Sequence, residues 1–345
     1  MSCTKNLYYG RIEVNFEMTS MLVTGAAGFI GSHLVEKLIE DGHHVTGIDN
    51  LSNGKIENLR EVLNHKNFKF LIEDISDLNL NALDTHNFDI VYHLAGLADI
   101  VPSIENPKKY FKANVVGTQV LIDYFKDKSI TKFVYAASAS CYGMAKEFPT
   151  NENSRIDLQY PYALTKFQGE QLVLHYGKVY KMPTISLRLF NVYGPRSRTN
   201  GTYGAVMGVF MKQKIANAPV TIVGDGEQKR DFVYISDVVE AFVKAGFSDK
   251  KDEAINIGSG NPKSVNFLAD LISDNRIYIP KRPGEPDLSK ADISKAKELL
   301  NWSPKVELTE GVEKMLQNLD YWKDAPLWDA ETISEATSIW FKYLT

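Results

Sequence analysis

The pattern that most limits the possible folds is the alternation of short apolar runs with longer amphipathic segments. The runs are rich in Val, Ile and Phe and lack polar alternation, as expected of parallel strands buried on both faces. We expect strands at 21–24, 44–49, 68–74, 90–95, 132–138 and 183–191. Amphipathic helical segments lie between them, for example at 32–41, 110–127 and 161–180. The sequence therefore predicts an α/β fold built on a doubly wound parallel sheet.

The texture of the chain changes after residue 191, where Gly and Pro become denser and the alternation stops. Short strands are expected at 220–223, 232–234 and 254–258, and helices at 237–245 and 265–273. We interpret this half as a smaller α/β substrate-binding region that is interleaved with the first domain. The expected divisions are an extension at 1–20, a first domain at 21–190 with 232–258 returning to it, a second domain at 191–231 and 259–325, and a C-terminal helix at 326–345 packed on the body or on a partner subunit.

Composition excludes several classes of protein. The formal net charge is −4, so the chain has no basic coat for a nucleic-acid backbone, and no nucleic-acid partner is expected. Two cysteines, Cys3 and Cys141, exclude a disulfide framework and make a zinc cluster improbable. No apolar stretch approaches the roughly 18–20 residues of a membrane span, and residues 1–18 do not resemble a signal peptide. We therefore expect a cytoplasmic protein without a membrane partner.

The strongest local motif joins the first expected strand to the first helix. It reads Thr-Gly-Ala-Ala-Gly-Phe-Ile-Gly-Ser, with glycines at 25, 28 and 31. Gly25 permits a tight turn, Gly28 lets the backbone approach a pyrophosphate, and Gly31 lets helix and strand pack closely. The helix N-terminus then offers N–H groups to phosphate oxygens. Although glycines often only make turns, the strand-then-helix context favours a dinucleotide site.

An acidic residue at the end of the second strand supports that site. Asp49 lies 18 positions after Gly31, where a carboxylate can accept hydrogen bonds from the adenosine ribose. No Arg occurs between it and Arg60 to pair with a 2′-phosphate. The sequence therefore favours NAD over NADP as the cofactor.

A second motif pairs Tyr162 with Lys166, which share a helix face because they are four positions apart. A neighbouring ammonium favours the phenolate and should lower the tyrosine pKa from its usual value of about 10, which would make Tyr162 a base. Tyr124 and Lys128 have the same spacing, but at the polar end of a helix. Only Tyr162 follows a strand that ends in a hydroxyl residue, Ser138, at the sheet edge where such folds bind ligands.

Together these motifs resemble the extended short-chain dehydrogenase/reductases, and specifically the nucleotide-sugar epimerase/dehydratase family. The resemblance covers residues 21–323 and also includes the segments 73–75, 93–96, 114–118, 188–195, 230–233 and 282–285. It implies a Rossmann-like sheet, NAD as cofactor and a nucleotide diphosphate sugar as substrate. His93 has no Cys or carboxylate cluster beside it in the sequence, so we expect a hydrogen-bonded strand residue there and no metal.

The resemblance also implies a role for individual residues. The catalytic group would be Ser138, Tyr162 and Lys166. The cofactor would be bound by Gly25, Gly28, Phe29, Ile30, Gly31, Asp49, Asn50, Ser52, Asp74, Ile75, Leu94, Ala95, Gly96, Asn114, Ala136 and Lys166. The substrate would be bound by Ser103, Ser138, Ser140, Tyr162, Asn191, Val220, Arg230, Arg282, Glu285 and Ser289.

The residues after Ser138 distinguish between branches of the family. Dehydratases resembling this chain carry an Asp-Glu pair there and decarboxylases a Glu, whereas this chain has Ala139 and Ser140. The motifs are therefore most similar to those of UDP-sugar 4-epimerases, such as UDP-N-acetylglucosamine or UDP-glucose 4-epimerase. In that chemistry Tyr162 would remove the proton of the sugar 4-hydroxyl while NAD accepts the hydride from carbon 4. The transient 4-keto sugar would then rotate about its diphosphate linkage and be reduced on its opposite face. A 4-keto-sugar reductase, an epimerase of another nucleotide sugar, a 4,6-dehydratase and a non-catalytic NAD sensor are the alternatives.

Two further expectations come from the resemblance. Ser289 stands three residues before Asp292 in an A-D-x-x-K-A segment, where the family places a residue that limits space at sugar carbon 2. A small side chain there would admit an N-acetyl group. Relatives commonly dimerise through helices equivalent to 110–127 and 161–180, so a homodimer is expected.

Overall fold

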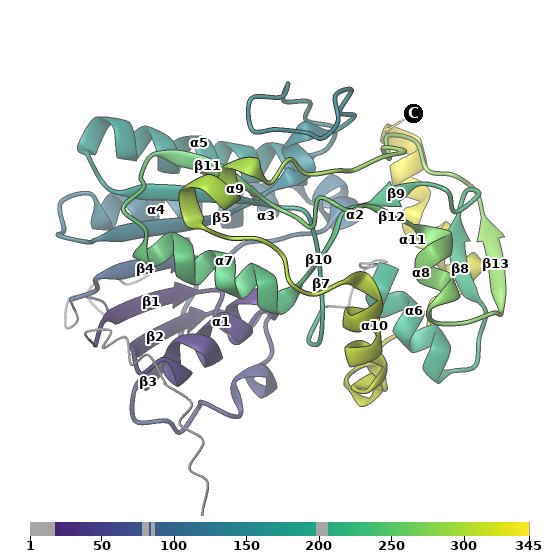
Figure 1. The fold of residues 1–345 in the computed structure, drawn as a ribbon, viewed down its shortest axis with the longest axis horizontal. Coiled ribbons are helices and arrows are strands. Elements are labelled where there is room, and N and C mark those ends of the chain that lie inside the picture. Colours follow the sequence, from purple (N-terminus) through teal and green to yellow (C-terminus); the bar gives the residue numbers. More distant parts are fainter. Residues whose placement is uncertain (1–17, 78–82, 84–86, 198–205, 345) are drawn as a thin grey trace, which may run out of the picture.

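The computed structural model describes residues 18–77, 83, 87–197 and 206–344, and its centre is one parallel sheet (Figure 1). The strands run in the order β11-β6-β5-β4-β1-β2-β3. Their bounds are β1 Ser20–Thr24, β2 His44–Asp49, β3 Phe68–Ile72, β4 Ile90–His93, β5 Lys132–Ser138, β6 Thr184–Leu189 and β11 Glu253–Ile257. From β1 the chain adds β2 and β3 on one side of this strand, and it later adds β4, β5, β6 and β11 on the other side. The predicted Rossmann-like, doubly wound α/β fold is confirmed.

Helices cover both faces of this sheet, which explains why its strands are continuously apolar. Helices α1 (Phe29–Glu40) and α7 (Ile235–Phe247) contact each other on one face, while α4 (Gly117–Phe125) and α5 (Pro161–Tyr180) contact each other on the other. Neighbouring residues of β1 point to opposite faces. Leu22 packs in one buried apolar cluster and Val23 in the other, and both are fully buried.

The segment expected as one helix at 110–127 is interrupted. Helix α3 (Pro107–Phe111) is followed by a π-helical turn, η3 (Lys112–Val116), and only then by α4. A short helix that the sequence pattern did not predict, α2 (Ile100–Glu105), precedes them. Such π-turns commonly occur at functional sites. Here the turn places the buried Asn114 between the loop that follows β4 and helix α5.

In the described part of the smaller region, three pairs of strands lie beside the main sheet. Strand β7 (Asn191–Tyr193) pairs with β10 (Phe232–Tyr234), β8 (Val220–Val223) with β13 (Arg276–Ile279), and β9 (Lys229–Arg230) with β12 (Lys263–Ser264). The expected strand 183–191 is therefore divided, because β6 ends at Leu189 and Asn191 begins a strand of this region. Helices α6 (Val206–Ile215) and α8 (Val265–Asp270) cover these strands.

The expected second-domain segment 259–325 does not stay in one region. Helix α9 (Ser294–Leu300) packs on β11 of the main sheet. The indole N–H of Trp302 donates to the carbonyl oxygen of Asp237 in α7, and the Asp237 carboxylate accepts from two backbone N–H groups, those of Lys305 and Val306. The chain then enters α10 (Leu308–Leu316), which contacts β10. This segment therefore joins the two regions rather than belonging to one.

The C-terminal segment forms helix α11 (Ala330–Tyr343), as expected. The Asp329 side chain accepts from the backbone of Thr332 in a capping box, and Ile333, Thr337 and Trp340 are buried along one face. The helix is packed on the body of the chain, at the end of the smaller region (Figure 1). The expected extension at 1–20 and Cys3 lie largely outside the described residues, although Ser20 already begins β1.

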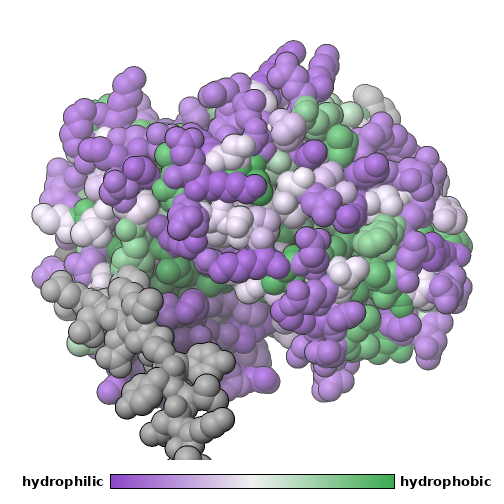
Figure 2. Space-filling model, in the orientation of Figure 1, coloured by the Kyte–Doolittle hydropathy of each residue, from purple (hydrophilic) through white to green (hydrophobic). Residues whose placement is uncertain are grey.

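The outer surface is mainly hydrophilic on the face shown in Figure 2, with separate hydrophobic patches between hydrophilic residues. Among the helices of the described residues, none combines the length and the apolar character needed to cross a membrane.

Candidate active site

The glycine-rich turn after β1 has the geometry that its sequence predicted. Gly25 has a φ of +71°, and a Cβ there would lie 2.8 Å from the backbone nitrogen of Ala95. A Cβ on Gly31 would overlap the carbonyl oxygen of Gly25. Helix α1 begins at Phe29, directly after Gly28. Because the first N–H groups of a helix have no intrahelical partner, this turn presents them to the adjacent cavity.

Asp49 stands at the end of β2 and is tied to the same turn. Its carboxylate accepts hydrogen bonds from the backbone N–H groups of Ala27 (3.0 Å) and Leu51 (2.8 Å). Burial raises the pKa of Asp49, while these two hydrogen bonds oppose the rise. The carboxylate is therefore fixed in position beside the glycine turn, where it also lines the cavity.

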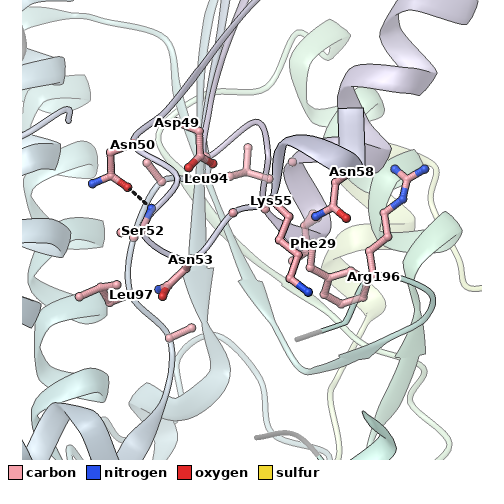
Figure 3. A pocket seen from close by; sticks show the side chains of 18 of the residues that line it. Phe29, Asp49, Asn50, Ser52, Asn53, Lys55, Asn58, Leu94, Leu97 and Arg196 are labelled. Atoms are coloured by element: carbon pink, nitrogen blue, oxygen red, sulfur yellow. Dashed lines mark hydrogen bonds between the residues drawn. The ribbon is translucent and has the colours of Figure 1, made fainter. Parts of the chain in front are cut away.

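A cavity of about 400 Å³ lies over this turn (Figure 3). Most of the predicted cofactor residues line it: Gly25, Gly28, Phe29, Ile30, Gly31, Asp49, Asn50, Ser52, Asp74, Ile75, Leu94, Ala95, Gly96 and Ala136. The residues that sequence reasoning missed include Asn53, Lys55, Asn58, Arg196 and Tyr321.

Two of the missed residues are cations, which corrects the argument against a nearby positive charge. Lys55 and Arg196 both have side chains at the cavity wall (Figure 3). The Arg196 guanidinium pairs with Glu36 at 2.6 Å and donates to the Ser32 hydroxyl at 3.2 Å, so it is held against α1. Lys55 could have been found by counting lysines as well as arginines after Asp49. Arg196 could not, because it comes from a distant segment.

Asn114 and Lys166 do not line this cavity but lie behind it. The Asn114 side chain accepts from the backbone N–H of Leu97 (2.7 Å) and donates to the Leu97 carbonyl (3.0 Å) and the Thr165 hydroxyl (3.0 Å). Leu97 belongs to the loop after β4 and Thr165 to α5. Asn114 therefore positions the cofactor-side loop relative to the helix that carries Tyr162.

Ser138 and Tyr162 are brought together where β5 ends and α5 begins. The Ser138 hydroxyl hydrogen-bonds the Tyr162 phenol, but burial outweighs this and raises the pKa of Tyr162 to about 12. Burial also lowers the pKa of Lys166 to about 7, and its Nζ lies 4.4 Å from the centre of the Tyr135 ring. The expectation that Lys166 lowers the Tyr162 pKa is therefore wrong for the polypeptide by itself, because burial weakens the charge of one group and opposes ionisation of the other.

A second cavity, of about 480 Å³, adjoins the first and is lined by the Ser138–Tyr162 pair. Ala98, Asp99 and Val192 line both cavities, so the two meet there. Asp99 was not singled out from the sequence, where no motif marks it. Its negative charge contributes to the raised pKa of Tyr162.

Eight of the ten predicted substrate residues line this second cavity: Ser138, Ser140, Tyr162, Asn191, Arg230, Arg282, Glu285 and Ser289. Ser103 does not, because it is fully buried and its hydroxyl donates to the carbonyl oxygen of Ile100. Val220 is fully buried too, while Thr221 and Val223 of the same strand line the cavity. Side chains alternate along a strand, so the Val220 side chain lies on the face of β8 opposite the cavity.

Three charged residues of the second cavity, Arg230, Glu285 and Arg282, are in contact with one another through Glu285. The Glu285 carboxylate lies 3.0 Å from the Arg282 guanidinium and 3.4 Å from that of Arg230. Burial lowers the pKa of Arg230 although Glu285 opposes this. Two guanidinium groups share one carboxylate, which leaves an excess positive charge suited to a diphosphate.

His93 is a hydrogen-bonded strand residue, as predicted. It is fully buried, with Nδ1 2.7 Å from the Thr24 hydroxyl and Nε2 2.9 Å from the Thr118 hydroxyl. Burial lowers its pKa to about 3. Within the described part of the chain, no group of three or more His, Cys, Asp or Glu residues could hold a metal ion.

Comparison with known proteins places the chain in a family. The family model described as GDP-mannose 4,6 dehydratase matches residues 22–315. A UDP-glucose 4-epimerase of Mycolicibacterium smegmatis is 36% identical over 304 residues, which are 86% of this chain and 97% of that protein.

Solved structures agree with that match. A UDP-glucuronic acid 4-epimerase from Bacillus cereus, in complex with UDP-glucuronic acid and NAD, has a TM-score of 0.80 and 35% identity, covering 88% of this chain and 99% of its own. A UDP-N-acetylglucosamine 4-epimerase from Methanobrevibacter ruminantium has a TM-score of 0.82 and 33% identity, covering 88% and 100%. This chain therefore belongs to the GDP-mannose 4,6 dehydratase family and is an NAD-dependent enzyme of the short-chain dehydrogenase/reductase type.

Proposed function

We propose that this enzyme interconverts the two C4 epimers of a UDP-sugar. The substrates are the pair UDP-N-acetylglucosamine and UDP-N-acetylgalactosamine, the pair UDP-glucose and UDP-galactose, or both pairs. The observation that supports the proposal is that Ser138 and Tyr162, hydrogen-bonded to each other, both line the second cavity (the substrate cavity), which adjoins the first (the cofactor cavity). Ala139 and Ser140 follow, so the segment lacks the carboxylates that other branches of the family carry there.

The residues of the first cavity fit NAD. The glycine turn leaves no room for a Cβ at Gly25 or Gly31, the N-terminus of α1 faces the cavity, and Asp49 is fixed at its edge. Asp49 would accept from ribose hydroxyls, and the glycine turn would bind the diphosphate. When bound, NAD supplies the hydride acceptor for carbon 4 of the sugar.

The chain's own groups supply binding and proton transfer. Arg230 and Asn191 would hold the diphosphate of the substrate, with Arg282 and Glu285 toward the nucleoside. Tyr162 would take the proton from the sugar 4-hydroxyl, with Ser138 orienting that hydroxyl through the hydrogen bond that it shares with the phenol. The cavity has a volume of about 480 Å³. A sugar that is held mainly by its diphosphate would have room there to turn either face toward the cofactor.

Ser289 supports the acetamido sugars as substrates, because its short side chain lies in the cavity wall. Filling that space should exclude an N-acetyl group and leave the smaller hydroxyl tolerated. Ser289→Tyr should therefore abolish turnover of UDP-N-acetylglucosamine while retaining UDP-glucose. Equal loss for both sugars would contradict a role for Ser289 in this choice.

The decisive experiment is incubation of the purified enzyme with single UDP-sugars without added cofactor, followed by NMR of the products. A 4-epimerase should reach an equilibrium of two epimers with no net consumption of NAD. A reductase would instead require a stoichiometric nicotinamide cofactor, and a pure NAD sensor would convert nothing.

Asp99 is an observation that favours a second candidate, a 4,6-dehydratase. It places a carboxylate beside Tyr162 at the junction of the two cavities, where it could move a proton. A dehydratase would release a 4-keto-6-deoxy sugar, which the same NMR experiment identifies by its new methyl signal.

The proposal includes a homodimer that acts in the cytoplasm. Helices α3 and α5, with the π-turn between α3 and α4, form an exposed apolar groove lined by Phe111, Val115, Leu164 and Phe167. Phe111 and Leu164 are 46% and 41% exposed. Leu164→Asp should convert a dimer into monomers in light scattering, and a wild-type monomer would contradict the proposal.

A further inference from the structure

The C-terminal helix α11 carries an aromatic side chain to the substrate cavity. Its buried face comprises Ile333, Thr337 and Trp340. Ile333 packs with Val223 and Ile279 of the smaller region, and Trp340 lines the cavity. This helix lies outside residues 22–315, the part of the chain that the family model matches. A helix outside the segment matched by the family model therefore contributes a side chain to this cavity.

Trp340 is fixed by the loop that carries Arg282. Its indole N–H donates to the carbonyl oxygen of Pro283 at 2.7 Å. The Arg282 guanidinium lies 5.5 Å from the centre of the indole ring, within the range of a cation–π interaction. Trp340 is only 4% exposed, so the indole is packed between α11 and this loop. The contact restricts the orientations that Arg282 can adopt.

A second aromatic residue connects Trp340 to the reacting end of the cavity. The ring centres of Trp340 and Tyr160 are 6.4 Å apart. Tyr160 lies parallel to Tyr162, with ring centres 6.4 Å apart and planes 4° apart. All three rings line the same cavity. The aromatic wall, Trp340, Tyr160 and Tyr162, therefore runs from Arg282 to the Ser138–Tyr162 pair.

We propose that Trp340 is a positioning residue that completes the substrate site. It holds Arg282 ready for the nucleoside end of the substrate and, with Tyr160, gives the bound nucleotide sugar an apolar wall. Fixing Arg282 before binding lowers the entropy cost of ordering it in the complex, so the contribution is to affinity rather than to the proton transfer at Tyr162. The inference rests on the proposed function, because it takes a nucleotide sugar as the ligand.

Three variants test this positioning role. Trp340→Ala should raise KM for the UDP-sugar and Kd for UDP by about tenfold, with kcat within about threefold of wild type. Trp340→Phe keeps a ring beside Arg282 and Tyr160 and should restore most of the affinity. Tyr343→Ala removes an aromatic residue of the same helix that is 59% exposed, and should change neither constant. Unchanged KM and Kd in Trp340→Ala, or an equal loss in Tyr343→Ala, would overturn the proposal.

Tryptophan fluorescence gives a readout that does not depend on turnover or on the stability of Trp340→Ala. Titration with UDP-glucose should change the emission of the wild type, and most of the change should be absent in Trp340→Phe. Of the other three tryptophans, Trp302 and Trp322 are buried elsewhere and Trp328 does not line the cavity. An identical change in both proteins would refute contact between Trp340 and the site. A wild type that binds UDP-glucose through Trp340 but converts no sugar would refute the proposed function alone.

Discussion

The two cavities of this enzyme are built in different ways. The cofactor cavity is formed mostly by the glycine turn and by the ends of neighbouring strands in the first half of the chain. The substrate cavity combines side chains from β5, α2, α5, β8, the loop 282–289 and α11. The first depends mainly on backbone shape and the second on side chains from distant segments. Backbone demands leave glycine patterns in a sequence, whereas a wall assembled from distant side chains leaves short separate motifs that do not show how they combine.

The largest expected effect comes from removing the proposed catalytic base, Tyr162, which lines the substrate cavity and not the cofactor cavity. Tyr162→Phe should reduce kcat by roughly 10²- to 10⁴-fold, since the ring remains but no phenol can take the proton. NAD content should be unchanged because Tyr162 does not line the cofactor cavity. Turnover assays and measurement of the NAD released on denaturation check both halves. Loss of NAD in this variant would show that the cavities are not separable.

Two glycines of the cofactor turn should respond differently. A Cβ on Gly31 would overlap the Gly25 carbonyl, so Gly31→Ala should destabilise the fold by about 1–3 kcal/mol. A Cβ on Gly28 would be 3.1 Å from the same oxygen, a contact that a shift of a few tenths of an ångström relieves, and Gly28 lines the cavity. Gly28→Ala should therefore weaken NAD binding with a smaller loss of Tm than Gly31→Ala. Thermal unfolding and NAD titration separate the effects. Equal losses of Tm would contradict this division of roles.

Lys166, which lines neither cavity, should make the stability of the fold depend on pH. Its pKa is lowered to about 7 by burial, whereas an unfolded lysine titrates near about 10.4. Between these values the unfolded chain holds a proton that the folded chain has lost, so stability rises with pH in this window. From pH 7 to 9 the wild type should gain roughly 2 kcal/mol relative to Lys166→Met. Urea unfolding at both pH values measures the gain, and a constant difference would contradict it.

The smallest expected effect is at the junction of the cavities. The negative charge of Asp99 contributes to the raised pKa of Tyr162, so Asp99→Asn should lower that pKa. The rise of kcat/KM with pH should then shift to lower pH, because the phenolate forms earlier. A pH–rate profile of both proteins checks the direction. A shift to higher pH would mean that Asp99 assists proton removal, as in the second candidate function.

The sequence by itself determined the sheet, the glycine turn and the Ser138–Tyr162 pair. Continuous apolar runs require strands covered on both faces, and a turn without room for a Cβ requires glycine. These are local demands, so they appear as local patterns. The same reasoning could not find the break at the π-turn, because residues 112–116 are compatible with an ordinary helix.

Only the tertiary structure decided how the substrate cavity is completed. It excluded Ser103 and Val220, because strand parity and burial turn them away from the cavity. It brought Arg196 to the cofactor turn and Trp340 to Arg282 across long intervals of sequence. It also reversed the expected pKa shift of Tyr162, since burial depends on everything packed around the ring. Contacts between distant segments and desolvation are set by the whole fold, and no spacing of residues encodes them.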